Sequence, residues 1–273
     1  MVDEFMHCAV WFNHFVRSQQ KPMSCLQAVF WDVDGTLADT EMDGHRPAFN
    51  AAFADFGLNW HWDPGLYQRL LSIPGGGQRM ASYAVEQGTP MEPETLEYLK
   101  QLKQDHYLKR IRSGAVALRP GVARLLKELS LAGIPQWIVT SSGDASVQAL
   151  MEGLFAGGSD PFAGSVTSND VPCHKPHPDP YLLALERSGV EPTQALAIED
   201  SAAGLRAATD ALIPCLLTPS PWDQELEHEF HRAVAVVDHL GEPTLPLRQT
   251  SGPSCRQGLI TLEYLHQLLV DRA

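Results

Sequence analysis

Two aspartates, one residue apart, follow the first apolar run of the chain. The run at residues 26–31 leads directly into Asp32, Asp34 and Gly35. Acidic residues are poor strand formers, so these two either cap a turn or perform chemistry. One carboxylate at a strand end can attack a substrate while the other moves a proton, and Gly35 allows a tight turn whose amides approach an anion. We expect Asp32 and Asp34 to be catalytic, with an acid-rich turn as the alternative.

Three further segments carry residue types that suit phosphoryl transfer. Thr140 and Ser141 end an apolar run and can donate to phosphate oxygens, although strands also often end in such a helix cap. Lys175 lies between prolines, where its ammonium group suits a phosphate; the alternative is a solvated surface lysine. Glu199 and Asp200 offer the hard oxygen ligands of Mg²⁺, or else cap the next helix. Together these residues predict positioning and neutralisation of a phosphate.

The elements that would bring these segments together alternate between strands and helices. Apolar runs predict strands at 26–31, 135–140, 195–198 and 213–217, and helical periodicity predicts helices at 121–131, 144–154, 178–188 and 201–210. This alternation predicts an α/β, Rossmann-like core with a mostly parallel sheet and helices on both faces. Because parallel strands end at one edge of a sheet, the four segments should meet there.

A helical stretch interrupts this alternation directly after the first strand. Apolar residues recur at helical spacing from Ala48 to Phe56, and further helices are expected at 80–85 and 94–111. We therefore predict an inserted, all-helical cap domain at 41–112. Such an insertion at the mouth of a parallel sheet can act as a lid.

The remaining chain completes the predicted domain organisation. The core is expected at 25–40 and 113–273, preceded by an N-terminal extension at 1–24. After Thr218 the sequence is rich in proline, glycine and serine up to about residue 258, with one strand-like run at 233–237 and a final helix at 259–270.

Composition limits the partners of this 273-residue chain. With 44% hydrophobic and 19% charged residues it is typical of a soluble globular protein, and no apolar run approaches the roughly 20 residues of a membrane span. A net charge of -13 disfavours nucleic acid and anionic lipid. Five scattered cysteines without CxxC spacing argue against a zinc site and against a disulfide framework, and they fit a reducing compartment. We expect a cytoplasmic monomer that acts on a small molecule.

In order and in residue type, the four segments resemble the motifs of the haloacid dehalogenase (HAD) superfamily of aspartyl phosphotransferases. The resemblance covers about residues 27–217. It implies that Asp32 becomes a phosphoaspartate and that Asp34 protonates the leaving oxygen and then activates water. The name-giving dehalogenases lack the second aspartate, so Asp34 argues against dehalogenation.

The same resemblance implies the ligands of the phosphate and of the metal. Thr140 and Lys175 bind the transferring phosphoryl group. Mg²⁺ is held by Asp32, the backbone carbonyl of Asp34 and Asp200. Glu199 supports the lysine or a metal-bound water.

Finer details resemble the CbbY group of this superfamily. The stretch TEMDGHR at 40–46 is similar to the group's TExDGHR, so Glu41, His45 and Arg46 are expected to contact substrate hydroxyls or phosphate. His45 alone is also compatible with a polar residue that starts a helix. The glycine turn around Gly76 is similar to the group's cap loop and presents amides to an anion, while Arg79 can grip a second phosphate. A simple turn is the alternative for the glycines.

The group implies a phosphatase for xylulose 1,5-bisphosphate, an inhibitor of the Calvin-cycle enzyme Rubisco. The product would be xylulose 5-phosphate. Gly77 and Gln78 stand where the group usually has lysine and glutamate, which removes a positive charge from the expected second phosphate site. Three alternatives remain open: a β-phosphoglucomutase-like sugar phosphomutase, a phosphoglycolate-type phosphatase, and a catalytically silent sugar-phosphate sensor.

Overall fold

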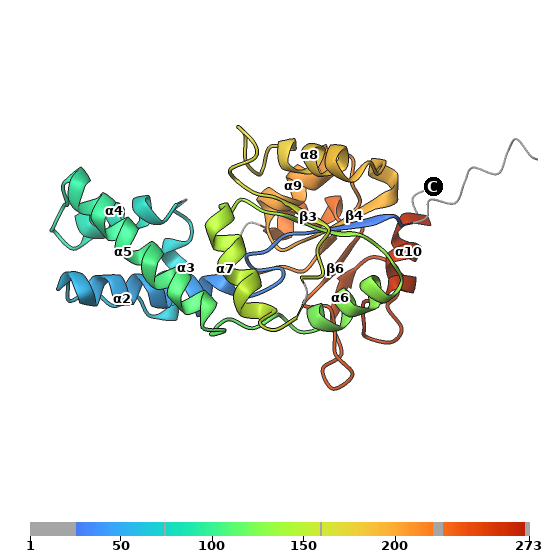
Figure 1. Cartoon of the computed structure of the whole chain (residues 1–273), viewed down its shortest axis with the longest axis horizontal. Coiled ribbons are helices and arrows are strands. Elements are labelled where there is room, and N and C mark those ends of the chain that lie inside the picture. Colours follow the sequence, from blue (N-terminus) through green and yellow to red (C-terminus); the bar gives the residue numbers. More distant parts are fainter. Residues whose placement is uncertain (1–25, 74, 159, 221–225, 271–273) are drawn as a thin grey trace, which may run out of the picture.

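A seven-stranded sheet forms the centre of the larger part of the molecule (Figure 1). The computed structural model describes residues 26–73, 75–158, 160–220 and 226–270, so the N-terminal extension predicted at 1–24 lies outside the described residues. The strands are β1 (Ala28–Trp31), β2 (Gln136–Val139), β3 (Gly164–Val166), β4 (Ala195–Glu199), β5 (Cys215–Leu217), β6 (Ala235–Val237) and β7 (Gln249–Ser251). Their order is β3-β2-β1-β4-β5-β6-β7, and all pairs are parallel except β6 with β7. The predicted mostly parallel α/β fold is confirmed.

Helices cover both faces of the sheet, as predicted. On one face lie α6 (Val122–Leu131), α7 (Asp144–Leu154) and α10 (Leu262–Val270), and on the other lie α8 (Asp179–Ser188) and α9 (Ala202–Asp210). Two short 3-10 helices are η2 (Pro192–Gln194) and η3 (Leu226–Arg232). The alternation of side chains along β1 explains the two layers, because Val29 and Trp31 join one hydrophobic core and Ala28 and Phe30 join the other. Fully buried strands need both faces covered.

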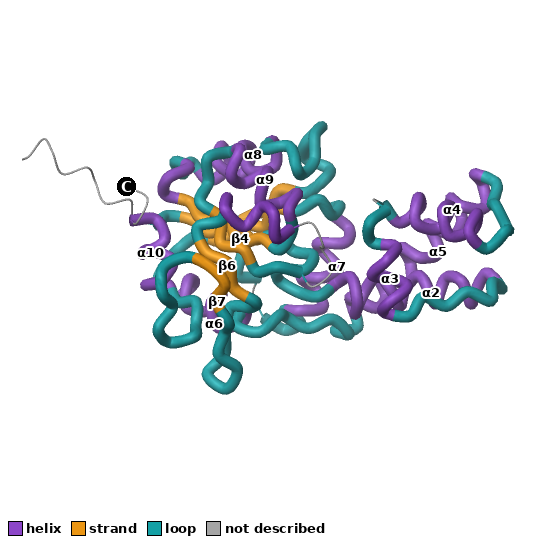
Figure 2. The backbone as a smooth tube through the Cα atoms, turned by 180° about the vertical axis from the view of Figure 1, so that it is seen from behind, coloured by secondary structure: helices purple, strands orange, loops and turns teal. Residues whose placement is uncertain are grey.

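A separate helical segment projects from the edge of the sheet where the strands end (Figures 1 and 2). It consists of a short π-helix, η1 (Glu41–His45), followed by α2 (Arg46–Phe56), α3 (Pro64–Leu70), α4 (Gly76–Glu86) and α5 (Pro93–Arg112). Its hydrophobic core is its own and is largely aromatic, with Phe49, Phe53, Trp62 and Tyr67 packed together. This segment therefore has an interior distinct from that of the sheet.

Besides the short helices η1, η2 and η3, one α-helix and two strands of the described residues were absent from the sequence-based expectations. Helix α3 begins with Pro64 and Gly65, which indicate a turn, yet Asp63 caps it by accepting a hydrogen bond from the Leu66 amide at 2.9 Å. Strand β3 has only three residues and no apolar run. Strand β7 is polar, and its position at the antiparallel edge requires no buried pattern.

The long helix α5 links the two parts of the molecule. It packs against α2 within the helical segment and against α7 of the core. The 20 residues of α5 include many charged side chains. None of the described helices is both long enough and apolar enough to cross a membrane.

Candidate active site

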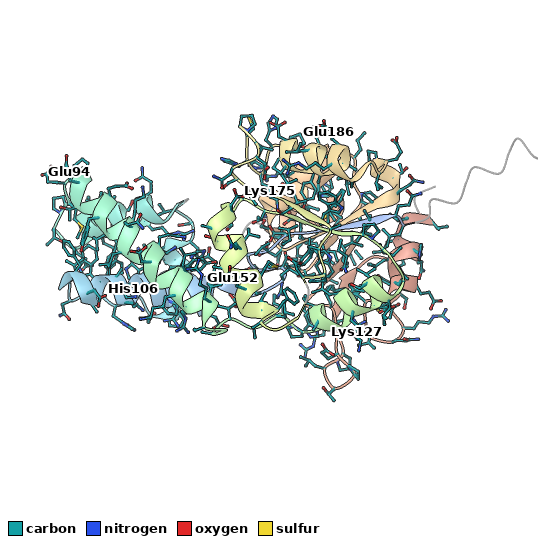
Figure 3. The ribbon with its side chains drawn as sticks, in the orientation of Figure 1. Glu94, His106, Lys127, Glu152, Lys175 and Glu186 are labelled. Atoms are coloured by element: carbon teal, nitrogen blue, oxygen red, sulfur yellow. The ribbon has the colours of Figure 1, made fainter. Side chains whose placement is uncertain are left out.

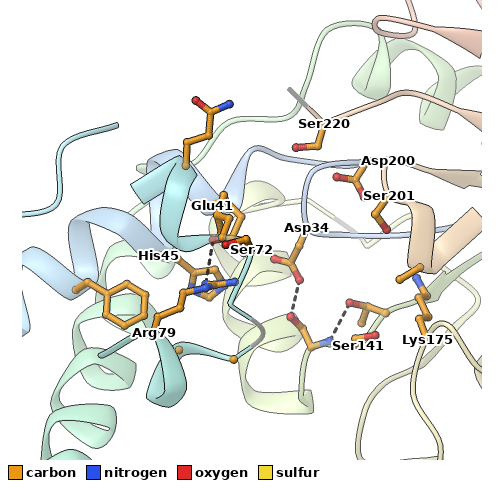
Figure 4. Close-up of a pocket in the computed structure, with 18 of the residues that line it drawn as sticks. Asp34, Glu41, His45, Ser72, Arg79, Ser141, Lys175, Asp200, Ser201 and Ser220 are labelled. Carbon is orange, nitrogen blue, oxygen red and sulfur yellow. Dashed lines mark hydrogen bonds and ion pairs between the residues drawn. The ribbon is translucent and has the colours of Figure 1, made fainter. Parts of the chain in front are cut away.

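A cavity of about 1040 Å³ lies between the strand ends and the helical segment. Figure 4 shows its two sides, with Asp34, Asp200 and Lys175 on the core and His45 and Arg79 on the helical segment. Asp32 and Asp34 follow β1, Thr140 follows β2 and Asp200 follows β4, so adjacent parallel strands deliver them to one place. Lys175 comes from the loop before α8 and is seen in the core in Figure 3.

Lys175 holds together the expected nucleophile, Asp32, and Glu199, which was expected at the metal site. Its Nζ donates to Asp32 Oδ1 and to Glu199 Oε1, both at 2.7 Å, and to the Val139 carbonyl at 2.6 Å. The side chain is only 5% exposed. Burial alone would lower the pKa of Lys175, but the neighbouring carboxylates outweigh it and raise the pKa above its ordinary value. Lys175 is thus a fixed positive charge beside Asp32.

Asp34 lies beside Asp32 but has different partners. Its carboxylate accepts hydrogen bonds from the hydroxyl groups of Thr40 and Ser142, each at 2.5 Å. Desolvation in the site, followed by the negative charge of Asp32, raises the pKa of Asp34 to about 6, although the two hydroxyl donors work in the opposite direction. A carboxyl group with a pKa near neutrality can both give and take a proton, as a general acid and base must.

The hydroxyl residues that follow β2 differ in their exposure and in their contacts. Thr140 is buried and its Oγ1 accepts a hydrogen bond from the Ser142 amide at 3.0 Å, while Ser141 is exposed and lines the cavity. Ser142, which had no predicted role of its own, orients Asp34. The segment therefore brings hydroxyl groups to the cavity and, through Ser142, holds Asp34.

Three carboxylates form a cluster that suits a divalent cation. Ligand oxygens of Asp32, Glu199 and Asp200 lie within 4.8 Å of one another, and all three residues are buried. Asp32 Oδ2 and Glu199 Oε2 have no hydrogen-bond partner within the described part of the chain. Burial and then the charges of the other two carboxylates raise the pKa of Asp200 well above its ordinary value. Hard oxygen donors and uncompensated negative charge fit Mg²⁺.

Gly35 makes the close approach within this cluster sterically possible. Its φ of +89° is in the region that favours glycine, and a Cβ atom at this position would lie 2.0 Å from Asp200 Oδ2. Even alanine at position 35 would displace the Asp200 carboxylate. Gly35 thus acts on the site by the absence of a side chain.

On the opposite wall, Arg79 and Glu41 share a hydrogen-bond network. Arg79 Nε donates to the Ile73 carbonyl at 2.9 Å, and its Nη1 lies 3.9 Å from Glu41 Oε2. The Tyr67 hydroxyl donates to the same Glu41 oxygen at 2.5 Å. The backbone contact fixes the guanidinium group while leaving donors for a ligand.

Lys103 adds a second cation to this wall. Its Nζ donates to His45 Nδ1 at 2.8 Å and lies 5.0 and 4.9 Å from the ring centroids of Phe49 and Tyr107. Burial lowers the pKa of Lys103 to about 8. Burial, together with the charges of Lys103 and Arg79, also lowers the pKa of His45, so His45 is a neutral acceptor that orients the lysine.

Of two further residues expected at the substrate, Arg46 does not line the cavity, whereas Gly76 lines it and has a second role in packing. The Arg46 guanidinium donates to the Trp62 carbonyl at 3.3 Å, and Arg46 is not among the described residues that line the cavity. Gly76 does line the cavity, but its lack of a side chain also serves packing, because a Cβ atom there would lie 2.9 Å from the Phe49 ring. The polar side chains of the helical segment that line the cavity are those of Glu41, His45, Gln68, Arg69, Ser72, Arg79 and Lys103.

Arg119 is a further residue that sequence reasoning missed. Its guanidinium group donates to the Gly35 carbonyl, to the Thr218 carbonyl at 3.0 Å and hydroxyl at 2.7 Å, and to the Asp238 carbonyl at 3.0 Å. It thereby ties the turn after β1 to the ends of β5 and β6. Its only sequence signal is an arginine ahead of a Pro-Gly pair at a helix start, which does not reveal these distant partners.

The family profile of the haloacid dehalogenase-like hydrolases matches residues 26–211. Among curated proteins, the plasmid-encoded protein CbbY of Cupriavidus necator is 43% identical over 231 residues, which cover 82% of this chain and 89% of that protein.

Solved structures agree with these sequence relatives. A variant of CbbY from Rhodobacter sphaeroides in complex with xylulose 1,5-bisphosphate matches with a TM-score of 0.69 and 35% identity, covering 80% of this chain and 96% of that one. A β-phosphoglucomutase-like protein from Thermotoga maritima matches with a TM-score of 0.64 and 26% identity, covering 78% and 94%.

Proposed function

The chain belongs to the haloacid dehalogenase-like hydrolases, and we propose that it uses Mg²⁺ to hydrolyse xylulose 1,5-bisphosphate to xylulose 5-phosphate and inorganic phosphate. The family and the CbbY relatives support a sugar-phosphate phosphatase. The substrate, the metal and the roles of individual residues are our proposal.

In the first step, an oxygen of Asp32 attacks the phosphorus of the substrate. The bond from phosphorus to the sugar oxygen breaks, and Asp34 gives its proton to that leaving oxygen. The pKa of Asp34, about 6, makes a protonated form available near neutral pH. The products of this step are the free sugar hydroxyl and a phosphoaspartate at position 32.

In the second step, water attacks the phosphoaspartate. Asp34, now ionised, takes a proton from this water, and the bond between phosphorus and the Asp32 oxygen breaks. Inorganic phosphate leaves and the Asp32 carboxylate is restored. The hydrogen bonds from Thr40 and Ser142 hold Asp34 in place for both proton transfers.

The core wall neutralises the reacting phosphoryl group. Lys175 lies 2.7 Å from Asp32, and the hydroxyl groups of Thr140 and Ser141 are available at the same wall. Asp32, Asp200 and the backbone carbonyl of Asp34 would hold Mg²⁺, with Glu199 in support. When bound, the ion supplies positive charge that offsets the repulsion between Asp32 and a phosphate dianion.

The observation that carries the choice of a bisphosphate is the pair of cations on the opposite wall. Arg79 and Lys103 line the same cavity as Asp32 but come from the helical segment. A guanidinium group and an ammonium group together suit a second phosphate. Lys103 therefore supplies a positive charge in place of the lysine that is absent at position 77. Position 77 itself has little room for a side chain, since a Cβ atom there would lie 2.9 Å from the side chain of Lys100.

A panel of phosphate esters tests the proposal. The purified enzyme would receive xylulose 1,5-bisphosphate, ribulose 1,5-bisphosphate, xylulose 5-phosphate, glucose 1-phosphate or phosphoglycolate, with Mg²⁺ or with EDTA, and release of inorganic phosphate would be followed. We expect the highest kcat/KM for xylulose 1,5-bisphosphate, one phosphate per substrate, and loss of activity in EDTA. A higher kcat/KM for a monophosphate would contradict the substrate assignment.

A phosphomutase is the second candidate, favoured by the likeness to the β-phosphoglucomutase-like structure. The two reactions share the phosphoaspartate and differ in whether water or a sugar hydroxyl accepts the phosphoryl group. Phosphorus NMR of the glucose 1-phosphate reaction separates them. Glucose 6-phosphate without inorganic phosphate would indicate a mutase, whereas inorganic phosphate alone indicates hydrolysis.

A further inference from the structure

A second cluster of metal-ligand side chains lies outside the cavity, in the loop between β3 and α8. Ligand atoms of Cys173, His177 and Asp179 all lie within 4.8 Å of one another. Cys173 and His177 are exposed, and Asp179 is half-buried at the first turn of α8. His177 Nδ1 and Asp179 Oδ1 are 3.0 Å apart. The cysteine spacing in the sequence argued against a zinc site, but folding brings Cys173 close to a histidine and an aspartate four and six residues further on, and the proposed phosphatase mechanism does not use these three residues.

The spacing of these atoms is compatible with coordination of one ion. Three atoms within 4.8 Å of one another share a point no more than about 2.8 Å from each, and zinc lies ~2.3 Å from sulfur and ~2.0–2.2 Å from nitrogen or oxygen. The required contraction is therefore at most about 0.5 Å for the sulfur ligand and at most about 0.6–0.8 Å for the nitrogen and oxygen ligands. Because the side chains are at the surface, rotation about their own bonds can supply it.

The donor set determines which ion fits. We propose that Cys173, His177 and Asp179 form a binding site for a borderline-soft transition-metal dication, with Zn²⁺ as the best match. Sulfur and imidazole donors favour such ions, and three protein ligands leave a fourth tetrahedral position for water. The buried cluster around Asp200 has oxygen donors alone and so favours a hard ion such as Mg²⁺. The two clusters would therefore select different metals from the same solution.

An ion bound at this site would restrict the loop that carries Lys175. Cys173 and His177 flank Lys175, whose Nζ contacts Asp32 and Glu199 at 2.7 Å. An ion bound by residues on both sides of Lys175 closes a short ring of backbone around it. The bound ion thereby reduces the conformational freedom of the loop that presents this lysine.

Cobalt provides a direct test because thiolate ligation to Co²⁺ produces a charge-transfer band in the near ultraviolet. The full-length enzyme would be titrated with Co²⁺ in excess Mg²⁺, which occupies the oxygen-only cluster. We expect a near-ultraviolet band that saturates at one Co²⁺ per chain and disappears when Zn²⁺ is added. Co²⁺ bound at Asp200 and its neighbours would give no such band, since that cluster has no sulfur.

Matched variants assign the band to this loop. Cys173→Ser should abolish it while phosphate release with Mg²⁺ stays within twofold of the parent, and His177→Ala should weaken Co²⁺ binding at least ~10-fold. Cys255→Ser and His174→Ala should both retain the band, because Cys255 belongs to a different part of the fold and His174 lies outside the cluster. Absence of the band in the parent enzyme, or its persistence in Cys173→Ser, would overturn the proposal.

Discussion

The two walls of the cavity hold their charges in different ways. On the core wall, Lys175 contacts two carboxylates and a carbonyl, and three acidic side chains are buried together. On the helical wall, Arg79 and Lys103 are cations with Glu41 as the nearby acid. The core wall thus has an excess of negative charge that requires a cation, whereas the helical wall has an excess of positive charge that requires an anion.

This difference in charge indicates that the core wall carries out the reaction and that the helical wall selects the substrate. The core residues follow strands of a buried sheet, whose hydrogen-bonded register fixes their relative positions. On the helical wall, Glu41 and His45 come from η1, Arg79 from α4 and Lys103 from α5, around a separate aromatic core. We infer that substitutions on the core wall change kcat, and that substitutions on the helical wall change which substrate is bound.

The largest effect is expected from removing the nucleophile. Asp32→Asn should lower phosphate release by roughly 10³-fold or more, because an amide oxygen cannot form the phosphoaspartate, while substrate binding persists. Asp43→Asn, an exposed aspartate in the same region, is the control and should be near the parent. Turnover retained in Asp32→Asn would contradict the assignment of Asp32 as the nucleophile and of the core wall as the place of the reaction.

The next effect should distinguish bisphosphate from monophosphate. Arg79→Met should lower kcat/KM for xylulose 1,5-bisphosphate by about 10–100-fold, as expected for loss of charged hydrogen bonds, and change a monophosphate much less. Arg69→Met provides the matched control, since Arg69 lines the same cavity but is already paired with Glu86 at 2.8 Å. Equal losses on both substrate classes would argue against a second phosphate at Arg79.

A positioning effect on the core wall should be smaller. Arg119→Gln should lower kcat by roughly tenfold with little change in KM, because the turn that carries Asp34 loses its anchor at Gly35. Arg124→Gln is the control, since this guanidinium also binds carbonyl groups, of Leu240 and Ile260, away from the cavity. If both variants change only the melting temperature, Arg119 has a purely structural role.

The smallest predicted effect is a pH dependence that belongs to the helical wall. The pKa of Lys103 is lowered to about 8, so the group is charged below that pH and loses its charge above it. The charged fraction of Lys103 falls about tenfold between pH 7 and 9, so KM for the bisphosphate should rise, by less than this factor because Arg79 stays charged. In Lys103→Arg the guanidinium stays charged, and this rise should disappear. A rise of the same size in Lys103→Arg would assign it to another group.

The core wall is the part of the site that sequence reasoning could anticipate. Asp32, Thr140 and Asp200 each stand at the end of an apolar run. Parallel strands bring such ends to the same edge of the sheet, independently of the length and conformation of the connecting loops. The same logic places the insertion after β1 at the mouth of the sheet. Local patterns therefore contain most of the information about this wall.

The helical wall depends on information that local patterns lack. Lys100, Lys103 and Lys109 are alike in sequence, and only the packing of α5 against α2 decides that Lys103 reaches His45 and the cavity. Arg46 shows the opposite case, since its motif indicated a ligand contact and its guanidinium instead binds the Trp62 carbonyl. Tertiary packing decides between equivalent charged residues, and single-sequence reasoning does not see it.

The hydrogen bond between Thr40 and Asp34 connects the position of the helical segment with proton transfer by Asp34. Thr40 is the residue directly before η1, where the chain leaves the core for the helical segment. Any swing of that segment about this junction moves a donor of the carboxyl group that transfers the proton. The proton affinity of Asp34 consequently depends on how the helical segment is placed relative to the core.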